Sequence, residues 1–158
     1  MKIVSGGQTG VDRAALDVAI SLGIDYAGWC PRGGLAEDQG SPPGLLTTYP
    51  HLTETPSDDP RQRTVRNVRD SDATLVLTRN GVVSPGTALT VLTAQRLGRS
   101  LHVQPLDEKD AVDQVAAWLR LLDPEGTLDV AGPRESQAPG IHDEAAVLLT
   151  AVLAAYAV

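Results

Sequence analysis

The residues best suited to chemistry lie where glycines and hydroxyl side chains follow short apolar runs. The first such segment is Ser5-Gly6-Gly7-Gln8-Thr9-Gly10, and a helical pattern of apolar residues begins directly after it. Glycines permit a tight turn, and the first turn of a helix offers unpaired N–H groups and a positive dipole end. The pattern predicts a phosphate-binding turn; the alternative is a tight turn that binds nothing. The residues that we assign to this part of the site are Gly6, Gly7, Gln8, Thr9, Gly10 and Arg13.

This turn differs from the two best-known phosphate-binding motifs. No Gly-Lys-Ser or Gly-Lys-Thr follows it, so it is not the P-loop of nucleoside triphosphatases. Its glycines are spaced as GGxxG, whereas the dinucleotide fingerprint requires GxGxxG. Taken alone, the turn therefore indicates an anion and leaves the rest of the ligand open.

Two further polar turns follow later strands of the predicted sheet. Ser84-Pro85-Gly86-Thr87 comes after the third strand, and Gly132-Pro133-Arg134-Glu135-Ser136 comes after the last one. Because ligands of such sheets bind outside the carboxyl ends of the strands, these turns can converge with the first on one anion. We expect the first and third strand-to-helix turns to hold a phosphate. The residues that we add to the site are Gly86, Thr87, Arg134 and Glu135.

One predicted helix carries a row of polar residues at helical spacing. Arg63, Arg66, Asn67 and Asp70 fall at positions i, i+3, i+4 and i+7, which share one face. In a functional interpretation this face is a positive wall beside the anion, because arginine forks suit phosphate, and Arg66 and Asn67 belong to the site. In the alternative interpretation the face is solvated and its arginines pair with neighbouring aspartates.

No metal site is predicted. Cys30 follows a strand and is either a soft metal ligand or a small buried filler, and the second interpretation is favoured. The three histidines, His51, His102 and His142, lack the spacing of zinc ligands.

The pattern of apolar residues predicts the elements that position these turns. Five strands are expected at residues 2–5, 24–29, 73–78, 100–104 and 127–131. Helices are expected at residues 11–22, 60–71, 86–97 and 108–122 and from residue 142 onward. This alternation predicts an α/β fold: a doubly wound, mainly parallel, Rossmann-like sheet in a three-layer α/β/α arrangement. Residues 30–60, rich in proline and glycine, are expected to form a long loop, which in a compact domain is usually functional or mobile.

Composition limits the class of protein. With 158 residues, 42% of them hydrophobic, we expect one globular domain over residues 1–158. The net charge of −7 argues against nucleic-acid binding. A single cysteine and the lack of a signal-peptide pattern indicate a reducing, cytoplasmic compartment. The longest apolar stretch, residues 145–158, is too short to span a membrane.

Several segments together resemble the molybdenum-carrier family. They are residues 5–17, 28–33, 36–38, 53–55, 66–74, 85–87 and 128–136, in order along almost the whole chain. The resemblance implies a Rossmann-like domain of the broad lonely-guy/DNA-processing superfamily, whose members bind nucleotide-like ligands. It also implies a carrier for the molybdenum cofactor, a pterin with a terminal phosphate, or for a related phosphorylated pterin.

The sequence departs from the enzymes of that superfamily at one informative position. Lonely-guy phosphoribohydrolases carry PGGxGTxxE, whereas here Pro85-Gly86-Thr87 is followed by Thr90 in place of the glutamate. A threonine cannot act as a general acid or base near neutral pH, so binding is expected and that hydrolysis is not. Glu37, Asp38 and Glu135 remain as carboxylates for a nucleotide-processing enzyme, the second hypothesis; a nucleotide-sensing module is the third.

The assembly is expected to be a homodimer or homotetramer. The resemblance implies such oligomers, and the terminal helix is apolar on more than one face. We therefore expect part of this helix, with the helix that begins near Gly86, to be buried between subunits.

Overall fold

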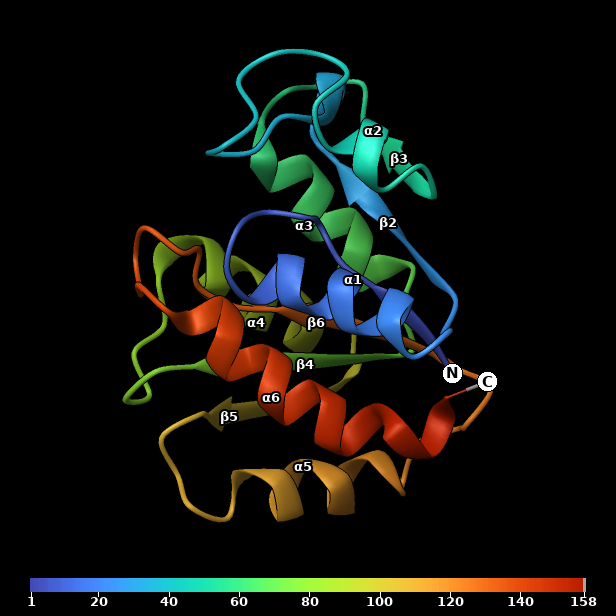
Figure 1. Cartoon of the computed structure of the whole chain (residues 1–158), viewed down its shortest axis with the longest axis vertical. Helices are drawn as coiled ribbons and strands as arrows, with labels where there is room; N and C mark the ends of the chain where they lie inside the picture. The colour runs from blue at the N-terminus through green and yellow to red at the C-terminus, as the bar shows by residue number, and fades with distance from the viewer. Residues whose placement is uncertain (158) are drawn as a thin grey trace.

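The protein is built on one six-stranded parallel sheet. In the computed structural model, which describes residues 1–157, the strand order is β3-β2-β1-β6-β4-β5 (Figure 1). The strands are β1 (Lys2–Val4), β2 (Tyr26–Cys30), β3 (Leu52–Glu54), β4 (Ala73–Thr78), β5 (Ser100–Pro105) and β6 (Thr127–Ala131). Every pairing between neighbours is parallel. The predicted doubly wound α/β fold is confirmed, with six strands where five were expected.

The additional strand, β3, lies in the segment that was predicted to be a loop. It pairs with β2, and the same segment holds a 3-10 turn, η1 (Arg32–Gly34), and a short helix, α2 (Leu45–Thr48). Of the three residues of β3 only Leu52 is buried, so the strand is too short to show the alternation that identifies a strand in a sequence.

Helices cover both faces of the sheet. They are α1 (Val11–Ser21), α3 (Pro60–Arg69), α4 (Pro85–Arg96), α5 (Ala111–Leu119) and α6 (Ile141–Leu153), followed by the 3-10 turn η2 (Ala154–Tyr156). Helices α1, α6 and α5 lie side by side over the near face in Figure 1, and α3 and α4 pack together on the other. The N-termini of two helices are set by their local sequence, because Asp59 caps α3 and Ser84 caps α4, each with proline at the first helical position.

The face under α1, α5 and α6 holds the main apolar core. Leu75 and Leu77 of β4 and Leu128 and Val130 of β6 pack there against the three helices. Helix α6 lies between α1 and α5 and buries Ala145, Leu148, Leu149, Val152 and Leu153 against its surroundings. A helix with a neighbour on either side needs apolar residues on more than one face. Contacts within one chain therefore account for these buried residues of α6, and the burial of this helix between subunits stays a prediction.

The opposite face is markedly more polar. Side chains alternate along a strand, so Thr74 and Thr78 of β4 and Asp129 of β6 point away from the apolar core, toward α3 and α4. All three are buried. Helix α4 presents more hydroxyls to this layer, since Thr87, Thr90 and Thr93 are its buried polar residues. This hydroxyl-rich layer between the sheet and α4 makes a polar site possible inside the fold.

None of the helices in residues 1–157 combines the length and apolarity needed to cross a membrane.

Gly28 allows β1 and β2 to approach each other. A Cβ at this position would lie 2.0 Å from the carbonyl oxygen of Ser5, and the Gly28 φ of +148° is one that other residues rarely adopt. We expect Gly28→Ala to lower the free energy of unfolding by about 1–3 kcal/mol or more, because the strands would have to move apart. Gly40→Ala is the control, since a Cβ there meets open space, and its effect should stay within about 0.5 kcal/mol. Urea denaturation measures both, and equal midpoints for the two variants would contradict this interpretation.

Candidate functional site

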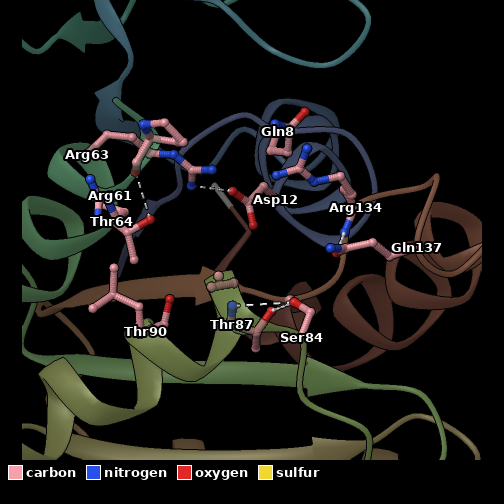
Figure 2. Close-up of a pocket in the computed structure, with 15 residues that line it drawn as sticks. Gln8, Asp12, Arg61, Arg63, Thr64, Ser84, Thr87, Thr90, Arg134 and Gln137 are labelled. Atoms are coloured by element: carbon pink, nitrogen blue, oxygen red, sulfur yellow. Dashed lines mark hydrogen bonds and ion pairs between the residues drawn. The ribbon is translucent and has the colours of Figure 1, made fainter. Parts of the chain in front are cut away.

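A cavity of about 90 Å³ opens where β1, β6 and β4 end, between these strand ends and the first turns of α3 and α4 (Figure 2). Its polar lining consists of amide, hydroxyl and guanidinium groups and one carboxyl group. The lining residues are Gln8, Asp12, Pro60, Arg61, Arg63, Thr64, Ser84, Gly86, Thr87, Leu89, Thr90, Ala131, Gly132, Arg134 and Gln137.

The cavity brings together the three polar turns identified in the sequence. Strand β6 lies between β1 and β4 in the sheet, so the turns that follow these strands are neighbours at one edge. Gln8 comes from the first turn, Gly86 and Thr87 from the turn before α4, and Arg134 from the loop after β6. These four residues of the predicted site line the same cavity.

The glycines of the first turn serve close packing of the chain on itself. A Cβ on Gly10 would lie 2.3 Å from the carbonyl oxygen of Pro133, and a Cβ on Gly6 would lie 2.2 Å from Nη1 of Arg63. Gly7 packs against the side chains of Leu45 and Leu52. These glycines let other parts of the chain come close, whereas the sequence had suggested that a ligand does so.

Part of the first turn faces a different groove. Thr9, Gly10 and Arg13 line an open groove together with Tyr49 and His142, and none of these five lines the cavity. The guanidinium of Arg13 donates two hydrogen bonds of 2.9 Å to Asp38 and one of 3.0 Å to the carbonyl of Gly7. Arg13 therefore fixes the turn from the side away from the cavity.

The carboxylates considered for catalysis hold the loops in place. Glu37 accepts hydrogen bonds from the hydroxyls of Thr9 and Ser136. Burial raises the pKa of Glu37, but these bonds and the charge of Arg134 outweigh it and leave the pKa below its ordinary value. Glu135 accepts from the backbone N–H groups of Gly140 and His142 at the start of α6. Glu37, Asp38 and Glu135 all lie outside the cavity lining.

A buried ion pair lies at the centre of the cavity wall. Nη1 of Arg63 is 3.0 Å from Oδ2 of Asp12, and Figure 2 shows the two side chains meeting between α3 and α1. The side chains of Arg63 and Asp12 are 12% and 5% exposed. Burial raises the pKa of Asp12, and the positive charge of Arg63 opposes this without cancelling it. Nε of Arg63 has no hydrogen-bond partner in the part of the chain that the structure describes.

The rest of the polar face of α3 contacts β2. The guanidinium carbon of Arg66 lies 4.7 Å from the centre of the Trp29 ring, a cation–π distance. Asn67 accepts from the Trp29 N–H at 2.7 Å and donates to the Trp29 carbonyl at 3.1 Å, and Asp70 accepts from the indole N–H at 2.7 Å. The structure thus places Arg66 and Asn67 outside the cavity, in contacts that hold α3 to the sheet.

Asp129 is a buried acid beside this ion pair that the sequence analysis missed. It is 2% exposed, and its Oδ2 lacks a hydrogen-bond partner among residues 1–157. Burial, and then the negative charge of Asp12, raise the pKa of Asp129 well above its ordinary value, against the charge of Arg63. The signal available in the sequence was an acidic residue within the apolar strand Thr127–Ala131.

Several residues that line the cavity were also not predicted as site residues. Asp12, Ser84 and Gln137 belong to segments that the sequence analysis recognised, but their side-chain directions depend on the conformation of the turns. The sequence placed Arg63 on the correct face of its helix. Nothing in the sequence distinguishes Thr64 from the other polar residues of that helix. No cluster of potential metal ligands occurs in the described part of the chain.

Comparison with known proteins agrees with the resemblance found in the residues. The model of the circularly permutated YpsA SLOG family matches residues 3–153. A crystal structure from Syntrophus aciditrophicus SB, described as a putative molybdenum carrier protein, is 38% identical in sequence with a TM-score of 0.83. That alignment covers 96% of this chain and 94% of the other. None of the curated proteins matches this chain.

The buried Asp129 predicts a defined dependence of stability on pH. Above the ordinary aspartate pKa of 3.8, the folded state retains a proton on Asp129 that the unfolded chain has released, so this residue lowers stability as pH rises. Asp129→Asn removes that dependence. Its free energy of unfolding relative to wild type should therefore increase between pH 4 and pH 7, as measured by urea denaturation. Asp25→Asn, at an exposed position, is the control. A difference that does not change with pH would show that Asp129 is ionised in the folded protein.

Proposed function

The chain belongs to the circularly permutated YpsA SLOG family, and we propose that it is a binding protein whose cavity holds the phosphate of a small ligand. The observation that carries the proposal is the convergence of three polar turns on one small cavity at the carboxyl edge of the sheet. The lining includes three arginines and a single carboxyl group, in a chain with a net charge of −7. A local positive excess of this kind suits an anion.

The first turn of α4 offers suitable donors for a phosphate. The backbone N–H of Thr87 lies 3.4 Å from the hydroxyl of Ser84, a long contact that a phosphate oxygen can replace. Gly86 adds an N–H in the same turn, and a Cβ at Gly86 would meet nothing within 4 Å, so the backbone is open to a ligand. Thr87 supplies a hydroxyl as well.

Arg134 is the arginine most available to the ligand. Its guanidinium is 3.9 Å from Glu37, beyond hydrogen-bond distance, and its side chain is 38% exposed. Arg61 instead pairs with Asp59 at 2.7 Å, and Arg63 is held by Asp12. We therefore expect Arg134 to contribute the main charge-assisted contact with the phosphate.

The proposed ligand is the molybdenum cofactor or a related phosphorylated pterin. The support is the description of the 38% identical protein as a putative molybdenum carrier protein, together with a cavity suited to a terminal phosphate. We propose binding rather than catalysis because the one carboxyl group in the lining, Asp12, is engaged by Arg63. Thr90, at the position of the lonely-guy glutamate, also lines the cavity and brings only a hydroxyl.

We further propose that the protein forms a homodimer or homotetramer through the outer face of α4. Leu92 of α4 and Leu97, directly after its end, are 41% and 47% exposed, and Val65 of the adjoining α3 is 38% exposed. Light scattering at tens of micromolar should report an oligomer for wild type and a smaller species for Leu92→Asp. Val147→Asp, at an exposed position of α6, is the matched control. A monomeric wild type would reject this assembly.

Two arginine variants test the phosphate site. Arg134→Ala should weaken the binding of ribose 5-phosphate by about ten- to a hundredfold, because a charge-assisted contact contributes about 1.5–3 kcal/mol. Arg66→Ala, which removes a charge from outside the cavity, should leave this affinity within about twofold. Isothermal titration calorimetry gives both values, and thermal unfolding confirms that both variants are folded. The proposal fails if Arg134→Ala binds as wild type does, or if wild type does not bind ribose 5-phosphate.

A further inference from the structure

A second pocket adjoins the phosphate cavity. It has a volume of about 260 Å³ and shares two lining residues with the cavity, Ser84 and Gln137. Its other walls come from the turn between β4 and α4 and the loop between β6 and α6. Because β4 and β6 are adjacent strands, the pocket and the cavity lie along the same edge of the sheet.

We propose that this second pocket binds the planar heterocyclic ring of the ligand whose phosphate lies in the cavity. The inference rests on the proposed function and extends it, because it defines the ligand as the monophosphate of a flat, purine- or pterin-sized heterocycle. A connecting segment of the ligand passes over Ser84 and Gln137.

The composition of the pocket suits both the apolar faces and the polar edge of such a ring. Val82, Pro133, Ala138 and Pro139 provide apolar walls for the ring faces. The amides of Asn80 and Gln137 can donate to or accept from the nitrogen and oxygen atoms at the ring edge. Apolar walls with a few placed polar groups are typical of small-molecule sites. The side chain of Val82, 68% exposed, would lose contact with water when a ring binds.

Hydrogen bonds hold the two loops in place before any ligand binds. Arg79 donates at 2.9 Å both to the carbonyl of Pro139 and to Glu144, which ties the β4–α4 turn to the β6–α6 loop and to α6. The turn is closed by a bond of 3.1 Å from the Val82 N–H to the Arg79 carbonyl. The Asn80 N–H donates to Asp107 at 2.8 Å. A pocket that is already formed spares the ligand the entropic cost of ordering these loops.

Size and continuity favour this pocket over the groove near Tyr49. The phosphate cavity, at about 90 Å³, is too small to enclose a whole ligand, so the rest of the molecule must lie beside it. The groove near Tyr49 shares no lining residue with the cavity. Its lining also carries three carboxylates, those of Asp17, Glu135 and Asp143, against one arginine, Arg13, and the histidine His142, which disfavours an anionic ligand there.

Titration with two probes separates the ring pocket from the phosphate site. Guanosine 5′-monophosphate presents both a phosphate and a planar ring, whereas ribose 5-phosphate presents no ring. Wild type should bind the first at least tenfold more tightly. Val82→Ser removes an apolar wall and should lower the affinity for guanosine 5′-monophosphate about three- to tenfold, with that for ribose 5-phosphate unchanged. Asn80→Gly should act likewise without backbone strain, since Asn80 has a φ of +54° that glycine adopts readily.

One control variant and three contrary outcomes complete this test. Val147→Ser makes the same change at an exposed position of α6 and should leave both affinities unchanged. Equal affinities of wild type for the two probes would overturn the ring pocket and leave the phosphate site standing. A preference for guanosine 5′-monophosphate that survives in both Val82→Ser and Asn80→Gly would place the ring elsewhere. Failure of both probes to bind wild type would reject the phosphate site and the ring pocket together.

Discussion

The buried ion pair between Arg63 and Asp12 connects the parts of the chain that surround the cavity. Arg63 reaches from α3 across Gly6 to the second residue of α1, and a Cβ on residue 6 would lie 2.2 Å from its Nη1. Because both side chains are largely buried, loss of either partner would leave an uncompensated charge, which typically costs about 3–5 kcal/mol. Gly6, the length of the arginine and the position of α3 are therefore mutually dependent. Arg63 is at once part of the cavity lining and part of the fold.

The two faces of the sheet differ in composition: one packs an apolar core, and the other carries buried polar side chains beside the cavity. The face under α1, α5 and α6 holds the apolar cluster, whereas the face toward α3 and α4 presents Thr74, Thr78 and Asp129 to a helix that contributes further threonines. Among residues 1–157 the buried hydroxyls of Thr74 and Thr78 have no hydrogen-bond partner, and burial raises the pKa of Asp129, so this layer is costly to bury. A fold selected for stability alone would place aliphatic residues there. A polar layer beside a cavity is the pattern expected when a binding site lowers the free energy of unfolding of the fold that holds it.

Much of the fold followed from local chemistry in the sequence. Asp59-Pro60 and Ser84-Pro85 identify helix starts because capping and the fixed φ of proline act within a few residues. The convergence of turns followed from the rule that parallel strands end at one edge. Strand β3 could not be predicted, because a three-residue edge strand with one buried residue has no periodicity to detect.

The side-chain directions within the site were the least predictable part. Gln8 faces the cavity and Thr9 the opposite groove, and this depends on a turn in which Gly7 and Gly10 have positive φ angles. Arg63 and Arg66 share a helix face by spacing, but one reaches the cavity and the other Trp29. Helical periodicity identifies a face without showing which strand each turn of that face will cross.

We propose that the ends of β1, β6 and β4 form a phosphate site, and a crystal structure of the protein saturated with ribose 5-phosphate would locate the phosphate. We expect the phosphate in the cavity, within hydrogen-bond distance of the Gly86 N–H and the Thr87 hydroxyl and in contact with Arg134. A phosphate bound instead in the groove between Arg13 and His142, with the cavity holding only water, would rule this site out.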